Sequence, residues 1–256
     1  MKIYTYYQNL NDQCQDELIE LWKISWSRQG YDPIVLNLED AKKHSYFETL
    51  NTEMRKIFKE LTNTEIGDYG MSCWFRWLAY ATQADEKFYV SDYDAINVNF
   101  PITEPNDKLH LMDDACPFFA SGTPTQFENL CKAFVEVSNQ RNEILKQQVN
   151  HYHDQNFFVH NFDPTNNDSA EELRNKYEIL MTRDRSKNGG HIDPVENKIH
   201  PHLAISNLEY IENEKYGVVH VSHDNIGILQ EKYAKYKKQN ASQLRIDIIK
   251  NLLQAN

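Results

Sequence analysis

The sequence has little of what marks membrane, secreted and disulfide-stabilised proteins. It has 256 residues, only 4 of them cysteine, and no two of these form a C-x-x-C pair. We therefore expect reduced, packed thiols and no disulfide framework. No stretch approaches the roughly 20 apolar residues that span a bilayer, and no signal-peptide core follows the opening "MKIYTYYQNL". These absences predict a cytoplasmic protein with no transmembrane segment.

Basic residues are also scarce relative to acidic ones. The chain has 27 Lys and Arg against 38 Asp and Glu, which gives a net charge of −11. Because an acidic surface repels polyanions, nucleic acid and anionic membranes are disfavoured as main partners. The 40% hydrophobic content is sufficient for a core, and we find no internal repeat or low-complexity linker. We therefore expect a single domain over residues 1–256.

The first hundred residues alternate between strand and helix patterns. Short runs rich in aromatic and β-branched residues predict strands at Lys2–Tyr7, Ile34–Leu36 and Phe88–Val90. Apolar residues at helical spacing predict a helix over Glu17–Trp26 and two more, marked by Met54, Ile57, Phe58 and Leu61 and by Met71, Trp74, Phe75 and Leu78. This alternation predicts an α/β fold with a mainly parallel sheet flanked by helices.

The second half of the chain is less regular. Thr123 and Pro124 are suited to the cap and first turn of a helix. The other expected elements are a strand in "CPFFASGTP", strands at Gln155–Phe162 and Val218–Val221, a long polar loop at Thr182–His202 and a helical tail from Ile226 to Leu253. A long loop in a compact domain is more often functional than idle.

The segment "KFYVSDYDAIN" (Lys87–Asn97) places two aspartates, Asp92 and Asp94, at the end of an apolar run. In an extended chain, residues i and i+2 point to the same side. Two adjacent carboxylates repel each other unless a cation lies between them. Mg²⁺ and Mn²⁺ commonly bind one or two protein carboxylates together with substrate phosphate oxygens. The pair therefore predicts a Mn²⁺ or Mg²⁺ site that bridges the protein to a diphosphate, and the alternative is a solvated acidic loop.

The stretch "SCWFRWLAYATQADEKFYVSDYDAIN" resembles the core of the metal-dependent glycosyltransferases that have a GT-A fold and a D-x-D motif. The likeness lies in a helix with Arg76, an apolar strand and then Asp92 and Asp94. Upstream, "LWKISWSRQGYDPIVLNLEDA" resembles the family's Trp-containing helix and following strand. The resemblance implies a GT-A-like, Rossmann-type sheet, with residues 1–100 binding the nucleotide sugar and residues 101–256, more irregular, binding the acceptor and ending in helices.

The resemblance also implies roles for individual residues. Asp92 would face the ribose or the metal, and Asp94 would bind the metal directly. Arg76 would contact the donor or hold the D-x-D loop, or would pair with an acid as a structural residue. The end of the first strand would line the nucleotide at Thr5, with Tyr6 or Tyr7 stacked on the base or simply packed in the core.

Two later motifs supply further candidates. Asp154, in "NHYHDQNFF", is the candidate catalytic or acceptor-binding carboxylate, because the resemblance implies an acidic D-Q pair on the acceptor side and a general base must be ionised and oriented; the alternative is a surface loop. His220, in "VVHVSHD", follows an apolar strand, and the resemblance implies a C-terminal histidine as third metal ligand. Imidazole suits Mn²⁺ better than Mg²⁺, and the alternative is a core histidine. The basic triplet Arg183, Arg185 and Lys187 would stabilise a departing diphosphate or lie in a solvated loop.

The motifs together predict a metal-dependent glycosyltransferase. It would move a sugar from a nucleotide-diphosphate sugar to a glycan, protein or small-molecule acceptor. The alternatives are a non-catalytic nucleotide- or carbohydrate-binding module and a D-x-D metal-dependent phosphatase. In phosphatases of the haloacid-dehalogenase type the aspartate pair lies on the first strand, whereas here it comes near residue 92. Zinc is disfavoured because no cysteine pair or H-E-x-x-H motif accompanies the H-x-H pairs.

Overall fold

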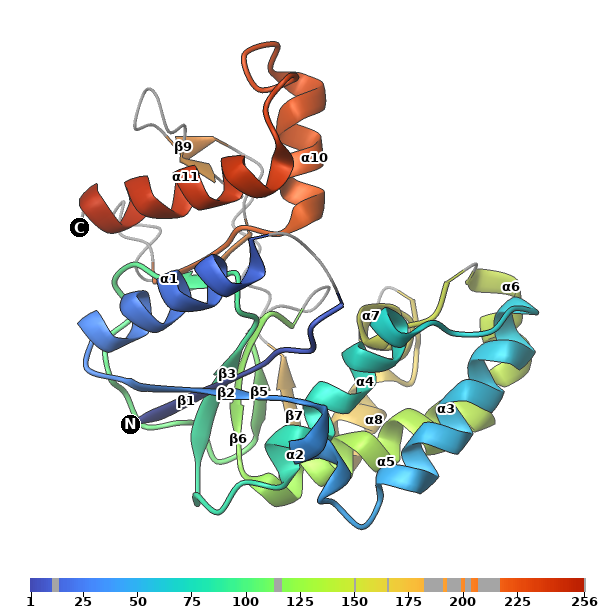
Figure 1. Ribbon diagram of the computed structural model, residues 1–256. Coiled ribbons are helices and arrows are strands. Elements are labelled where there is room, and N and C mark those ends of the chain that lie inside the picture. The colour runs from blue at the N-terminus through green and yellow to red at the C-terminus, as the bar shows by residue number, and fades with distance from the viewer. Residues whose placement is uncertain are drawn as a thin grey trace.

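A computed structural model describes residues 1–10, 14–112, 117–149, 151–164, 166–181, 191–192, 199–200, 204–206 and 217–255. Its centre is a six-stranded sheet with the strand order β2-β1-β3-β6-β5-β7 (Figure 1). These strands are β1 (Lys2–Tyr6), β2 (Asp32–Leu36), β3 (Phe88–Ser91), β5 (Leu109–Leu111), β6 (Phe119–Gly122) and β7 (Ile179–Met181).

The sheet is mixed but mainly parallel. β1 runs parallel to both β2 and β3, and β5 runs parallel to β7. Only β6 is antiparallel to its neighbours, β3 on one side and β5 on the other. The strands predicted at the start of the chain are confirmed, and so is the α/β class with helices on the sheet.

Helices cover both faces of the sheet (Figure 1). One face is covered by α1 (Gln15–Arg28), with α10 (His223–Lys232) and α11 (Ala241–Ala255) packed beyond it on the same side, and the other chiefly by α2 (Leu38–Lys42), α3 (Phe47–Thr62), α4 (Asp68–Ala81) and α5 (Pro124–Gln140). The chain also forms α6 (Asn142–Gln148), α7 (Asp154–Asn161) and α8 (Ala170–Lys176). Thr123 caps α5 as predicted, since its side chain accepts a hydrogen bond from the backbone N–H of Gln126 at 3.2 Å.

A second, three-stranded sheet lies beyond the end of β3. It has the order β10-β11-β4, formed by β10 (Ala204–Ser206), β11 (Val218–His220) and β4 (Ala95–Asn97), and β11 is antiparallel to both neighbours. β8 (His191–Ile192) and β9 (Ile199–His200) form a separate antiparallel pair. The pairing of β11 with β4 brings the late strand next to the residues that follow the aspartate pair.

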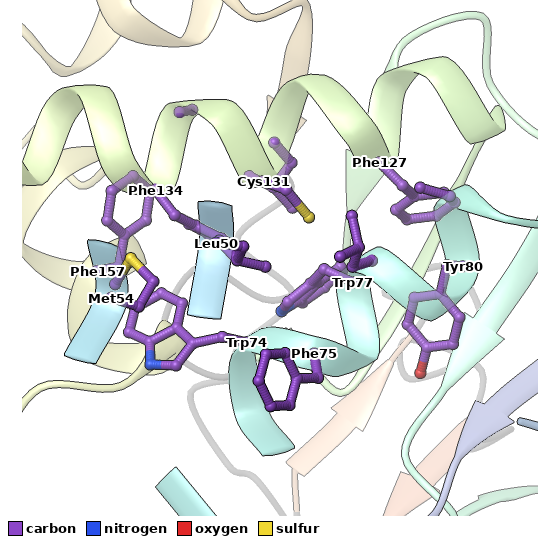
Figure 2. Packing of buried hydrophobic residues seen from close by; sticks show 14 of the residues in the cluster. Leu50, Met54, Trp74, Phe75, Trp77, Tyr80, Phe127, Cys131, Phe134 and Phe157 are labelled. Carbon is purple, nitrogen blue, oxygen red and sulfur yellow. The ribbon is translucent and has the colours of Figure 1, made fainter. Parts of the chain in front are cut away.

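The larger of two hydrophobic clusters fixes the position of α4. Trp74 and Trp77 project from α4 toward α5, where the ring of Trp74 lies 4.9 Å from that of Phe134 and the ring of Trp77 lies 6.1 Å from that of Phe127 (Figure 2). The same helix also packs on α3, so it is buried on most sides. With its apolar faces held in this way, α4 leaves Arg76 close to the edge of the sheet where β3 ends.

The structure differs from the sequence prediction in three places. Gln155–Phe162 is not a strand, because residues Asp154–Asn161 form α7. The predicted helical tail is confirmed but is divided into α10 and α11. Of the expected long loop, the described residues include β8 and β9, while Arg183, Arg185 and Lys187 lie outside the described residues. In the part of the chain that the structure describes, no helix has the length and apolar character needed to cross a membrane.

Candidate metal centre

The aspartate pair lies in a tight turn at the carboxyl end of β3. Strand β3 ends at Ser91, and the chain turns through Asp92–Asp94 before it continues as β4. The backbone N–H of Ala95 donates to the carbonyl oxygen of Asp92 at 3.0 Å, which closes the turn. The expectation of an extended chain is therefore wrong: the two carboxylates converge because the chain folds back, not because strand residues alternate.

Two tryptophans of α1 hold both ends of this turn. The indole Nε1–H of Trp22 donates to Ser91 Oγ at 2.9 Å, and that of Trp26 donates to the carbonyl oxygen of Ala95 at 3.1 Å. Both indoles are fully buried in the second hydrophobic cluster. A buried hydrogen bond of this kind is costly to leave unmade, so α1 fixes where the turn begins and ends.

His220 meets the two carboxylates from the neighbouring small sheet. It lies opposite Ala95 in the pairing of β11 with β4. Its Nε2 atom is 3.2 Å from Asp94 Oδ1 and 3.7 Å from Asp92 Oδ2, and one ligand atom from each of the three residues lies within 4.8 Å of the others. Its ring stacks on Phe118, with 4.6 Å between centroids. The structure thus brings together the three residues that were predicted as metal ligands.

The charges of this triad are strongly coupled. Burial raises the pKa of Asp92 to about 6, although Arg76 and His220 act in the opposite direction. Burial would also raise the pKa of Asp94, but His220 and Arg245 outweigh it and hold that pKa well below its usual range. For His220, burial lowers the pKa and the neighbouring Asp94 more than offsets this, so the net shift is upward. Because the pKa values of Asp92 and His220 are raised, a divalent cation that bound to the triad would displace protons from it.

Arg76 connects Asp92 to Asp154. Its Nη1 atom donates to Asp92 Oδ1, while its Nε and Nη2 atoms donate to Asp154 Oδ2 at 2.9 and 2.5 Å. Asp154 accepts two more hydrogen bonds, from Trp77 Nε1 at 2.8 Å and from the backbone N–H of Gln155 at 2.9 Å. Burial would raise the pKa of Asp154, but Arg76, His153 and Trp77 outweigh it and lower the pKa to about 2. Asp154 is therefore an ionised, buried carboxylate that anchors Arg76.

Arg245 approaches Asp94 from α11. Its guanidinium donates from Nη2 to Asp94 Oδ2 at 2.5 Å and from Nε to the carbonyl oxygen of Val221 at 2.9 Å, and its Nη1 lies 2.7 Å from His223 Nε2. The side chain is 1% exposed. The sequence contained a signal for this residue that our interpretation missed, namely an arginine within the apolar tail "LRIDIIKNLL".

The three residues predicted to line the nucleotide differ in their burial and in their distance from the aspartate turn. Thr5 is fully buried, and its Oγ1 has no hydrogen-bond partner among the described residues. Tyr6 is 8% exposed and belongs to the larger hydrophobic cluster, with its hydroxyl donating to Gln8 Oε1 at 3.1 Å. Tyr7 follows β1 and makes an edge contact with Tyr93, which stands between the two aspartates, at 5.9 Å between centroids. Of the three, only Tyr7 adjoins the turn.

The donor set of two carboxylates and one imidazole fits a divalent cation. Oxygen donors suit Mg²⁺ and Mn²⁺ alike, and the nitrogen donor favours Mn²⁺. Asp92 is the most exposed of the three side chains, at 21%, against 11% for Asp94 and 7% for His220, so the site opens to solvent on the side of Asp92. Comparison of the chain with protein-family models, with curated proteins and with solved structures found no match, so the chemistry of this triad carries the functional conclusion.

Proposed function

We propose that the chain is a metal-dependent glycosyltransferase with a GT-A-like fold, which moves a sugar from a nucleotide-diphosphate sugar to an acceptor. The observation that supports this function best is the convergence of Asp92, Asp94 and His220 at the carboxyl end of β3. This strand lies inside the sheet, between the parallel β1 and the antiparallel β6. In open α/β sheets, ligands bind in the crevice beyond the carboxyl ends of the strands.

The residues of the triad would hold Mn²⁺, or Mg²⁺, through Asp92 Oδ2, Asp94 Oδ1 and His220 Nε2. When bound, such an ion supplies Lewis-acid stabilisation of the charge on a diphosphate leaving group. The chain itself orients the two carboxylates through Arg76 and Arg245, and Arg245 and His220 keep Asp94 ionised. The nucleotide would lie over the first hundred residues, next to Tyr7, and the acceptor over the remainder of a single domain.

Asp154 fits a positioning role better than that of a general base. A base needs an oxygen within hydrogen-bonding reach of the acceptor hydroxyl. Here Oδ2 accepts from Arg76 and Trp77, Oδ1 accepts from the backbone of Gln155, and the residue is 2% exposed. We therefore assign Asp154 to the orientation of Arg76, and through it of Asp92.

The test is the release of free nucleotide diphosphate from UDP-, GDP- and CDP-sugars, measured with and without Mn²⁺. We expect release from at least one donor, dependent on the metal and lost in Asp94→Asn. A thermal-shift screen of the same donors with Mn²⁺ identifies the nucleotide. Metal-dependent binding of a donor without any release, in the presence of a panel of acceptors, would indicate the non-catalytic module instead. Unchanged turnover in Asp94→Asn would refute the site assignment.

A further inference from the structure

The two aspartates of the triad are each held from behind by an arginine. Arg76 on α4 occupies Oδ1 of Asp92, and Arg245 on α11 occupies Oδ2 of Asp94. The oxygens that remain, Asp92 Oδ2 and Asp94 Oδ1, are the ones that face His220, at 3.7 and 3.2 Å. The two arginines come from opposite sides of the main sheet, since α4 lies on one side of it and α11 lies on the other, beyond α1 (Figure 1). Each carboxylate thus presents a single oxygen to the centre of the triad.

Arg245 is the more deeply placed of the two arginines. Its side chain is 1% exposed, compared with 14% for Arg76. Burying a guanidinium is costly unless its donors are paired, and those of Arg245 reach Asp94, Val221 and His223. Separately, the backbone N–H of Val221 donates to the carbonyl oxygen of Asp94 at 2.9 Å, which joins the two segments that carry the triad. Arg245 at Oδ2 and His220 at Oδ1, 3.2 Å away, oppose rotation of the Asp94 carboxylate.

We propose that Arg245 is a metal-specificity residue, which restricts Asp94 to one oxygen ligand and so favours Mn²⁺ over Ca²⁺. Ca²⁺ takes 6 to 8 oxygen ligands and often binds carboxylates through both oxygens, at about 2.3 to 2.6 Å. Mn²⁺ accepts fewer ligands and tolerates the imidazole of His220. With Oδ2 of Asp94 bonded to Arg245, the site lacks the second oxygen that a larger cation requires. This inference rests on the metal centre of the proposed function.

The test compares the preference for Mn²⁺ over Ca²⁺ in the wild-type chain and in three variants. Mn²⁺ affinity is measured from the electron paramagnetic resonance signal of free Mn²⁺, and Ca²⁺ affinity from competition in the same titration. In Arg245→Met the ratio of Mn²⁺ to Ca²⁺ affinity should fall by about 10-fold or more, the usual size of an effect from a residue that orients a ligand. In Arg245→Lys it should fall less than in Arg245→Met, because an ammonium can still donate to Asp94 Oδ2, although it cannot replace the whole fork of donors.

The matched control is Arg28→Met. Arg28 on α1 also holds α11, since its Nη1 donates to the carbonyl oxygen of Leu253 at 2.5 Å, and among the described residues it makes no hydrogen bond or ion pair with the triad. Loosening α11 at this point should leave the metal preference unchanged.

The outcomes separate the two proposals. An unchanged affinity ratio in a folded Arg245→Met chain, or in Arg245→Lys if the methionine variant does not fold, would overturn the role of Arg245 while leaving the metal centre intact. An equal loss of affinity for Mn²⁺ and for Ca²⁺, which would preserve the ratio of the two affinities, would also overturn the role of Arg245. Failure of the wild-type chain to bind either ion would instead refute the metal centre itself.

Discussion

Replacement of Asp154 by asparagine tests the arginine network most directly. The change keeps the shape of the side chain but removes the charge that pairs with Arg76, a pair in which the two side chains are 3% and 14% exposed. The asparagine amide would also face the donors of Trp77 and Gln155, which now bond to carboxylate oxygens. Removing one partner of a buried ion pair is strongly destabilising because it leaves an uncompensated buried charge.

The pKa of Asp154 sets the size of the effect. It lies at about 2, below its ordinary value of 3.8, so the ionised form is bound more tightly in the folded chain. Since one pKa unit corresponds to about 1.4 kcal/mol, this difference between the folded and the ordinary pKa contributes about 2 to 3 kcal/mol to the free energy of unfolding at neutral pH. Asp92 still pairs with Arg76 in the variant, so we expect the loss to be about 3 kcal/mol, at the low end of the range for broken buried pairs.

The pH dependence of this loss has a definite sign. Because the folded pKa is depressed, the contribution is fully present above the unfolded value of 3.8 and is lost as the pH falls toward about 2. The assay is urea unfolding of wild type and Asp154→Asn at pH 7, 5, 4 and 3, with the exposed Asp168→Asn as a control of equal charge change. The difference in the free energy of unfolding between wild type and Asp154→Asn should be constant from pH 7 to 5 and should become smaller below pH 4.

Two results would refute this reasoning. The first is a loss of unfolding free energy at pH 7 in Asp154→Asn that is no larger than the loss in Asp168→Asn. The second is a loss in Asp154→Asn that is the same at pH 3 as at pH 7. Ligand binding separates the positioning role from that of a base. If Asp154 is a positioning residue, its replacement should weaken Mn²⁺ affinity, because Asp92 loses its fixed orientation. If Asp154 is a general base, its replacement should affect turnover alone.

Three further predictions concern the fold around the site. Thr123→Ala should lower the free energy of unfolding by about 1 kcal/mol in urea titrations, because it removes the cap of α5; a variant as stable as wild type would contradict that role. Leu50→Ala, in the fully buried contact of α3 with α4, should cost about 2 to 5 kcal/mol in the same assay, and a loss below that of Thr123→Ala would show that the packing there is loose. Burial raises the pKa of Cys73 to about 12, so mass spectrometry should find iodoacetamide labelling at pH 8 slower there than at the exposed Cys14, and equal rates would be inconsistent with this environment.

The elements that could be predicted from the sequence are those whose apolar residues recur at a clear helical or strand spacing. The helices over Glu17–Trp26 and around Met54 and Met71 have an apolar stripe of helical spacing, and all are confirmed. The pattern of Gln155–Phe162 does not separate a strand from a helix, because its apolar residues are a run of three, Phe157–Val159, and Phe162 at the end. Tertiary packing favours the helix α7 for this segment, because the rings of Phe157 and Phe158 both contact the ring of Phe134.

The site was partly predictable for a different reason. Asp92 and Asp94 are separated by a single residue, and two like charges at the end of a strand are themselves the signal. His220 was predicted from its position after an apolar strand, but its approach depends on the pairing of β11 with β4, which no local pattern specifies. The contacts of Arg245 and of the α1 tryptophans depend on how helices dock against the turn, so they follow only from the structure.

The most direct test of the metal centre is the stoichiometry of Mn²⁺ binding. Electron paramagnetic resonance titration of the wild-type chain should give one Mn²⁺ per chain, and this binding should be lost in Asp94→Asn and weakened in His220→Gln. Circular dichroism establishes whether each variant is folded. If the wild type binds no Mn²⁺, or if a folded Asp94→Asn chain binds it as tightly as the wild type, then the acids after β3 do not form a metal site.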